Sequence, residues 1–222
     1  MTTPTTTIIS TTVKPIVYPD SDGQPMADNT KQFEEICALK LGCEAEFATR
    51  DNVFVAGDLL WYPLQGQPTV RQAPDVLIAF GRPRGNRGSY KQWEEGNIAP
   101  QVVFEILSPG NRFGEMLRKL EFYERHGVQE YYVYDPDSFE FTVFWRSPED
   151  RLVLQEETTN LTSPLLGLRF EAPGDAPWTI HHSDGERLKR YDELRTERNA
   201  LREQVEHLQA RLRALGIDPE NP

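Results

Sequence analysis

The chain has 222 residues, of which 38% are hydrophobic and 10% aromatic, and its formal net charge at pH 7 is −11. This composition fits a folded protein with room for one sizeable domain and an appendage, and it excludes a chain that is disordered throughout. The acidic balance repels phosphate at long range, which argues against extended, non-specific binding to nucleic acid.

Membrane and export signals are missing from the sequence. No apolar run reaches the length of about 18 residues that a transmembrane helix needs. The start, MTTPTTTIISTT, has neither the basic nor the continuous apolar region of a secretory signal. Cys37 and Cys43 form no CxxC motif and no disulfide framework. We therefore expect a cytoplasmic protein with two reduced thiols.

The first third of the chain predicts an arm, a helix and two strands. Residues 1–28 are rich in Thr, Pro and Asp and are expected to form an irregular arm. Asp28 or Asn29 suits the N-cap of a helix with apolar residues at helical spacing, and Gly42 suits its end. Strands are predicted at 53–55 and 59–62.

The middle of the chain predicts a strand–helix–strand crossover. Two short apolar runs, 74–81 and 100–107, are typical of central strands buried on both faces. A helix is expected from Asn111 to Gly127, followed by a strand at 128–134. This order predicts a parallel strand pair. A trailing hairpin and a last strand are predicted at 139–145, 152–156 and 165–170.

The C-terminal segment, 186–216, predicts a coiled-coil helix. Apolar residues recur at three- and four-residue steps over four heptads, with Arg198 as the single polar member: Tyr191, Leu194, Arg198, Leu201, Val205, Leu208, Leu212 and Leu215. The narrow stripe favours self-pairing, most simply as a homodimer. The alternative is an amphipathic helix that docks on its own domain.

Two carboxylates interrupt the predicted central strands. Asp75 opens one apolar run, and Glu105 lies inside the other, VVFEIL. A charge in a buried strand is costly unless it is paired or coordinates a metal. On adjacent strands the two acids could share Mg²⁺, which needs only one or two protein carboxylates. Alternatively, Asp75 caps a turn and Glu105 pairs with a basic side chain.

Lys119 lies on the helix that follows the Glu105 strand, at the rim of its apolar stripe. Its long side chain could return to that strand and meet Glu105. The alternative is a surface ion pair with Glu115, four residues earlier.

These residues belong to an ordered string of motifs: Ala73-Pro74-Asp75-Val76, Val103-Phe104-Glu105-Ile106-Leu107-Ser108-Pro109, Glu115 to Lys119, and Gly127-Val128-Gln129-Glu130-Tyr131. The string, over about residues 28–170, resembles the Uma-type family of restriction endonucleases, within the PD-(D/E)xK nuclease superfamily. The resemblance implies an α/β, restriction-endonuclease-like αβββαβ core with a mixed sheet over 29–182. It also implies Mg²⁺, or Mn²⁺, on Asp75 and Glu105, and DNA as the substrate.

The sequence departs from the superfamily pattern at one catalytic position. Where the superfamily carries a lysine two residues after the glutamate, this chain has Leu107. Lys119 matches the lysine that the Uma-type family carries on the following helix, so the resemblance assigns the catalytic role to Lys119. An acid on the first helix, common in the superfamily, could be Glu34 or Glu35, and the sequence does not choose between them.

A basic cluster lies in the polar stretch between the two acid-bearing strands. Its members are candidates for DNA contact, because Arg binds phosphate and an aromatic ring stacks on a base: Arg82, Arg84, Arg87, Lys91 and Trp93. The alternative is a solvated loop in which these cations pair with Glu94, Glu95 and other acids and Trp93 packs on the domain.

Together these features predict a metal-dependent endonuclease that hydrolyses DNA phosphodiester bonds, with Asp75, Glu105 and Lys119 as catalytic residues. The rival prediction is a non-catalytic scaffold or binding protein that keeps the fold and assembles through its coiled coil. The net acidity and Leu107 favour the rival, and the intact Asp–Glu–Lys set disfavours it.

Overall fold

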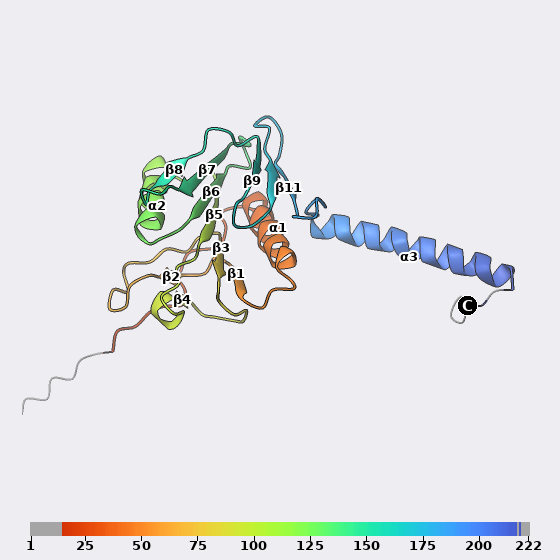
Figure 1. Cartoon of the computed structure of the whole chain (residues 1–222), viewed down its shortest axis with the longest axis horizontal. Helices are drawn as coiled ribbons and strands as arrows, with labels where there is room; N and C mark the ends of the chain where they lie inside the picture. Colours follow the sequence, from red (N-terminus) through yellow and green to blue (C-terminus); the bar gives the residue numbers. More distant parts are fainter. Residues whose placement is uncertain (1–14, 217, 219–222) are drawn as a thin grey trace, which may run out of the picture.

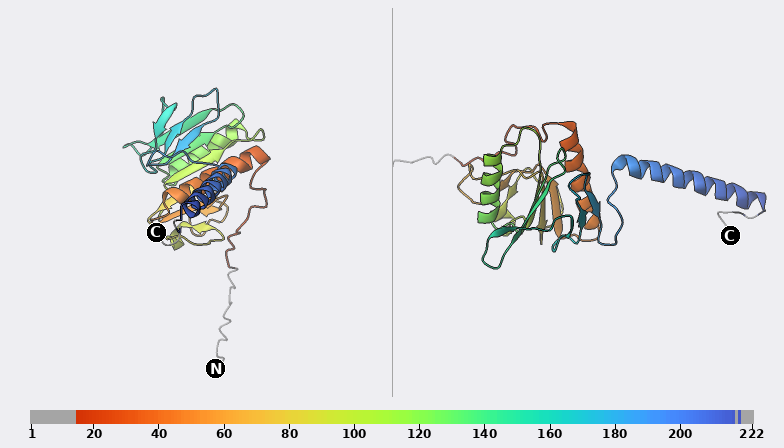
Figure 2. Two further views of the ribbon diagram at one scale, coloured as in Figure 1. Left: turned by 90° about the vertical axis from the view of Figure 1, so that its right-hand side faces the viewer. Right: turned by 90° about the horizontal axis from the view of Figure 1, so that it is seen from above.

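A computed structural model describes residues 15–216 and residue 218. Its centre is a six-stranded mixed sheet in the order β1-β3-β5-β6-β7-β8, with a helix on each face (Figures 1 and 2). The strands are β1 (Val53–Gly57), β3 (Val76–Phe80), β5 (Val102–Ile106), β6 (Glu130–Tyr134), β7 (Phe141–Arg146) and β8 (Leu152–Leu154). Together with α1 (Thr30–Glu46) and α2 (Phe113–Arg125), the first four form the expected αβββαβ core.

The crossover through α2 produces the predicted parallel pair. β5 and β6 run parallel, with Val102 opposite Glu130 and Ile106 opposite Tyr134, whereas the other pairs of the sheet are antiparallel. The α2 helix begins after Arg112, one residue later than the predicted cap. Asn111 does not cap it, because its Oδ1 accepts a hydrogen bond from the backbone N–H of Ser108 at 2.7 Å.

Two layers of core lie on opposite faces of the sheet. Alternate residues of β3 and β5, such as Val76 and Phe104, face α1, whereas Leu77 and Val103 face α2. A second sheet packs on the α1 side, in the order β9 (Asn160–Thr162), β10 (Arg169–Glu171) and β11 (Thr179–His181), with β10 in the centre. The sequence pattern predicts neither β9 nor β11, because three-residue strands carry too little alternation to be recognised.

The polar stretch between β3 and β5 contains short elements. The strand β4 (Tyr90–Lys91) pairs in parallel with β2 (Trp61–Tyr62), and the 3₁₀ turn η1 (Gln92–Glu94) follows. The described part of the N-terminal arm has no helix or strand, and its first 14 residues lie outside the described residues. Tyr18 of the arm packs against the ring of Tyr62, with centroids 5.2 Å apart.

The C-terminal helix α3 (Tyr191–Ala214) projects away from the sheet and its covering helices (Figures 1 and 2). None of its residues is buried. Among the residues that the structure describes, no helix has both the length and the apolar character needed to cross a membrane.

The first helix does not end at Gly42. Asn29 caps its start as predicted, since its Oδ1 accepts from the N–H of Gln32 at 2.8 Å, but the helix continues to Glu46. Gly42 is instead a notch that admits Leu188. A Cβ added at Gly42 would lie 1.9 Å from Leu188 Cδ1.

The notch predicts that alanine at this position destabilises the protein, contrary to what helix propensity alone would give. Alanine ordinarily stabilises a helix by about 1 kcal/mol over glycine. We expect Gly42→Ala to lower the free energy of unfolding by about 1–3 kcal/mol, because Leu188 must move. Urea denaturation measures the change. The control is Gly114→Ala in α2, where a Cβ finds only the end of Arg118 at 3.8 Å, and this variant is expected to be neutral or stabilising. A Gly42→Ala variant as stable as the unmodified protein would contradict the notch.

Candidate active site

Asp75 and Glu105 lie on neighbouring strands and face the same side of the sheet. In the antiparallel register of β3 and β5, Val76 is opposite Phe104, so the next step places Asp75 opposite Glu105. Residues directly opposite each other project from the same face. Here it is the α2 face, to which Val103 also projects. Asp75 Oδ2 accepts a hydrogen bond from the N–H of Ile106 at 2.6 Å, which fixes its carboxylate beside β5.

Glu105 is 2% exposed, and α2 supplies two donors to it. Lys119 Nζ lies 2.8 Å from Glu105 Oε2, and the hydroxyl of Tyr123 donates to Oε1 at 2.5 Å. The surface pair of the alternative also exists, because Glu115 Oε1 is 4.0 Å from the same nitrogen. The contact with Glu105 is shorter and buried, so it dominates the position of Lys119.

The electrostatics of the three groups are coupled. Burial, and then the charge of Glu105, raise the pKa of Asp75 well above its usual range, against the hydrogen bond from Ile106. Burial alone would lower the pKa of Lys119, but the charge of Glu105 and the hydrogen bond to it outweigh burial and raise that pKa. The lysine therefore stays charged, and the ionised form of Asp75 is disfavoured.

Asp58 is a third acid near Asp75 and Glu105, and the sequence pattern does not single it out. It follows the end of β1, and its N–H donates to the carbonyl of Asp75 at 3.2 Å. Its φ of 46° lies in the left-handed region, which asparagine and aspartate tolerate best among residues with a side chain. Burial and the charges of Asp22 and Glu105 raise the pKa of Asp58. The only sequence signal was an aspartate directly after a strand ending in Gly57.

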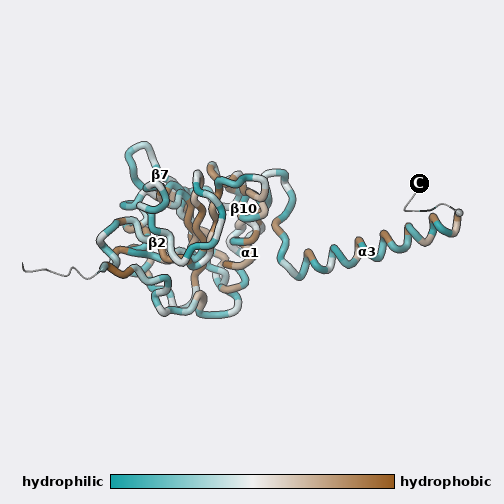
Figure 3. The backbone as a smooth tube through the Cα atoms, turned by 90° about the horizontal axis from the view of Figure 1, so that it is seen from below, coloured by the Kyte–Doolittle hydropathy of each residue, from teal (hydrophilic) through white to brown (hydrophobic). Residues whose placement is uncertain are grey.

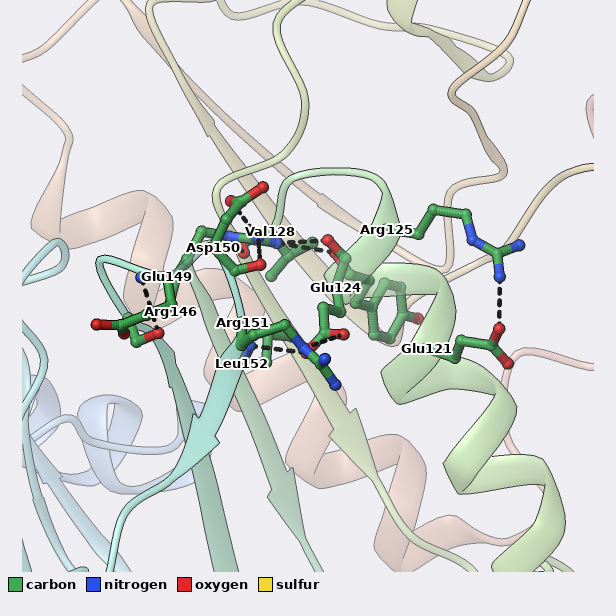
Figure 4. A network of polar contacts seen from close by, with 11 residues as sticks. Glu121, Glu124, Arg125, Val128, Arg146, Glu149, Asp150, Arg151 and Leu152 are labelled. Atoms are coloured by element: carbon green, nitrogen blue, oxygen red, sulfur yellow. Dashed lines mark hydrogen bonds and ion pairs between the residues drawn. The ribbon is translucent and has the colours of Figure 1, made fainter.

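The end of α2 is tied to the hairpin of β7 and β8 (Figure 4). Lys119 and Tyr123 lie on the same helix. Arg146 donates to the carbonyl of Glu124 at 2.6 Å, where a helix end leaves carbonyls without partners, and to that of Val128, beyond the helix, at 2.7 Å. Glu124 pairs with Arg151 at 2.8 Å and accepts from the N–H of Leu152 at 2.9 Å.

The acids of the first helix are not brought to Asp75. Glu35 is 7% exposed, accepts from the indole N–H of Trp178 at 3.1 Å, and pairs with Arg190. Glu34 lies 3.9 Å from the same arginine. The α1 helix covers the face of the sheet opposite to α2, so these acids lie away from Asp75. They pair with Arg190, directly before α3.

The arginines of the polar loop are engaged within the protein. Arg82 and Arg87 both pair with Glu95, at 2.9 and 2.5 Å, and Glu95 is 8% exposed. Hydrogen bonds and charge from these two arginines outweigh burial and lower the pKa of Glu95. Arg84 donates to the carbonyl of Phe47. The alternative predicts this pairing with Glu95, but the paired side chains are largely buried and not solvated.

The other two candidates of that loop also have partners. Lys91 lies 3.7 Å from Glu94, which is a weak contact. Trp93 packs against Tyr18 of the arm, with ring centroids 4.9 Å apart, so the indole is part of the packed surface.

The donor set fits a hard divalent cation that keeps most of its water. Asp75 and Glu105 supply oxygen ligands from one face, and each carboxylate retains lone pairs beyond its present bonds. The hydroxyl of Tyr131, buried nearby on β6, has no hydrogen-bond partner among the described residues, and the charges of Glu105 and Asp75 contribute to raising its pKa after burial. No group of three or more His, Cys, Asp or Glu side chains arranged for a metal is found in the described part of the chain. An oxygen-only donor set of this kind differs from the Cys and His sets that close structural metal sites.

The like-charged acids predict that neutralising one of them stabilises the metal-free protein. The folded state disfavours the ionised form of Asp75. The cost of ionising Asp75 is therefore absent at low pH, and it develops as pH rises from the ordinary pKa of an aspartate to the raised one. At pH 7 in EDTA, we expect Asp75→Asn to increase the free energy of unfolding by about 1 kcal/mol, since asparagine can still accept from Ile106. Asp137→Asn, in an exposed pair with Lys31, is the control and should change stability by under about 0.5 kcal/mol. A loss of stability in Asp75→Asn would mean that the attraction of Lys119 exceeds the repulsion.

Comparison with known proteins places the chain in a family. Residues 22–173 match the model of the Uma2 family, which is described as "Putative restriction endonuclease". No curated protein sequence matches the chain. Among solved structures, a "putative nuclease belonging to DUF820" from Anabaena variabilis ATCC 29413 is similar at 16% identity, with a TM-score of 0.46, over 68% of this chain and 84% of that chain. The family match spans most of the chain, including Asp75, Glu105 and Lys119, and the chain therefore belongs to the Uma2 family of restriction-endonuclease-like proteins.

Proposed function

We propose that the protein is a metal-dependent endonuclease that hydrolyses phosphodiester bonds of DNA. The observation that carries the proposal is the buried arrangement of Glu105 opposite Asp75, with Lys119 Nζ 2.8 Å from Glu105. If Lys119 only formed an ion pair at the surface, its partner would not need to be buried. If Lys119 and Glu105 only stabilised the fold, no second carboxylate would be needed opposite Glu105. Membership of the Uma2 family supports the same activity.

Each residue has a distinct role in this proposal. Asp75 and Glu105 hold Mg²⁺, with Mn²⁺ as a substitute of similar ligand preference. When bound, the cation supplies Lewis-acid stabilisation of the phosphate and lowers the pKa of bound water. The ammonium of Lys119 orients the attacking water or stabilises charge developing on the phosphate. Tyr123 keeps Glu105 in place through its second oxygen.

Contact with the DNA backbone is proposed for the polar loop. Arg84 and Lys91 are its cations that do not pair with Glu95, so they are the first candidates within the set Arg82, Arg84, Arg87, Lys91 and Trp93. We also propose self-association through α3, whose apolar stripe is exposed, and a reducing cytoplasmic location, consistent with the two free cysteines.

The first test removes one carboxylate. Plasmid cleavage with Mg²⁺ or Mn²⁺ should disappear in EDTA, and Asp75→Ala should lower it at least about a hundredfold because a cation ligand is lost. Calorimetric titration with Mg²⁺ alone provides a readout without cleavage: the unmodified protein should bind and Asp75→Ala should not. Asp137→Ala is the exposed control. A folded, unmodified protein that neither binds the cation nor cleaves DNA would support the rival function, a scaffold that keeps the fold, which the acidic charge and Leu107 favour.

The second test addresses Lys119. We expect Lys119→Met to lose nearly all cleavage. It should also lower the free energy of unfolding by roughly 1–3 kcal/mol, because Glu105 is left buried without its cation. Cleavage is therefore measured at a temperature at which circular dichroism shows both proteins folded. Lys31→Met removes an ion pair of the same 2.8 Å length from the surface and should keep full activity. Cleavage retained by folded Lys119→Met would exclude a catalytic role for this lysine.

A further inference from the structure

The helix α3 presents an apolar stripe that nothing in the described structure covers. At 1.5 Å per residue its 24 residues extend about 36 Å. Leu201 and Leu208 are 55% and 56% exposed, and Figure 3 shows apolar positions recurring along the helix. A contiguous apolar surface of this length is a mark of an interaction site.

A second apolar surface begins where α3 leaves the domain. On the outer face of α1, Phe33 is 47% and Leu41 is 55% exposed, and with Tyr191 they line a groove of about 380 Å³. A neighbouring groove of about 220 Å³ is shared by Leu41 and Leu194, the first leucine of the stripe. The stripe of α3 is therefore continuous with the outer face of α1.

We propose that α3 pairs antiparallel with α3 of a second copy, in the register that places Arg198 opposite Leu208 and Val205 opposite Leu201 of that copy. The inference rests on the self-association proposed above and adds its direction and register. In this register every residue of the stripe faces a residue of the stripe of the second copy. Its four kinds of layer are Tyr191 with Leu215, Leu194 with Leu212, Arg198 with Leu208, and Leu201 with Val205, and each occurs twice.

Charge decides between the two directions. Both directions form two Glu–Arg pairs beside the stripe: Glu197 meets Arg202 of the second copy in the parallel pair and Arg211 in the antiparallel pair. The parallel pair also stacks Arg198 on its counterpart in the apolar seam and brings Arg190 to Arg195 on both sides.

The antiparallel pair has one such like-charge contact, between Arg202 and its counterpart at the two-fold axis. It also buries Arg198 against leucine, over which its alkyl stem packs. In the antiparallel pair the dipoles of the two helices also point in opposite directions, so that unlike ends attract.

The groove on α1 supports the same direction. In the antiparallel pair, Leu212 and Leu215 of the second copy lie across Leu194 and Tyr191. The end of that helix then reaches the surface formed by Phe33 and Leu41. The antiparallel arrangement also places the two domains at opposite ends of the helix pair, about 36 Å apart.

Disulfide trapping in the full chain tests the direction. The background variant is Cys37→Ser, whereas Cys43 stays, because burial raises the pKa of its thiol to about 12 and leaves it unreactive. Leu194→Cys and Leu212→Cys are oxidised separately and after mixing with subunit exchange. In the antiparallel pair, residue 194 lies 18 residues, about 27 Å, from residue 194 of the second copy, and the same holds for residue 212. We therefore expect a linked dimer only in the mixture. A linked dimer from Leu194→Cys alone would show the parallel pair and overturn the proposal.

A second measurement tests the groove. In sedimentation equilibrium of the full chain, Leu41→Glu should raise the dimer Kd at least tenfold, while Leu64→Glu, an exposed leucine of the loop after β2, should leave it unchanged. An unchanged Kd in Leu41→Glu would exclude the groove from the interface. A monomeric unmodified protein would overturn self-association itself, and the cleavage assays above report on the nuclease proposal independently of either result.

Discussion

A carboxylate in the middle of a central strand needs compensation, and much of this structure supplies it to Glu105. The strand β5 is buried along its whole length, so the charge of Glu105 has little access to bulk water. Compensation comes from α2, whose Lys119 and Tyr123 each take one carboxylate oxygen. The helix must therefore lie across this strand at one position along its axis. The crossover to β6 and the bonds of Arg146 to the end of α2 hold it there.

The compensation is incomplete, which is informative about function. Asp58 follows β1, Asp75 precedes β3, and Glu105 lies in β5; the three acids influence one another, and Lys119 acts on all three. A protein selected for stability alone would replace one of these acids, since buried like charges cost free energy and functional sites retain such costs. A divalent cation bound beside these three acids would neutralise their excess negative charge. In contrast, Arg82 and Arg87 share the single acid Glu95, so that cluster carries no excess negative charge.

The juxtaposition of these residues could be anticipated from the sequence because its signal is local, and their catalytic role stays a prediction. Asp75 and Glu105 stand out against apolar runs, and the length of the crossover predicts the parallel pair that brings α2 back over β5. Asp58 was missed because it adjoins a glycine bend, where an aspartate is ordinary. The hydrogen bond of Tyr123 to Glu105 could not be predicted, because nothing in the sequence around Tyr123 shows that its hydroxyl meets Glu105. Gly42 was taken as a helix end because its partner, Leu188, is far away in the chain. Contacts between distant segments are what a single sequence does not contain.

The packing of Leu188 into Gly42 and the ion pair of Arg190 with Glu35 determine where the chain is safely shortened. A protein cut near residue 182, where the predicted domain stops, would lose both contacts and expose the notch of α1. One cut after Arg190 would keep them and lose only the projecting helix. A comparison of these two truncations would separate loss of assembly from loss of folding. Crystallisation or binding work on the globular part should therefore end the chain at Arg190.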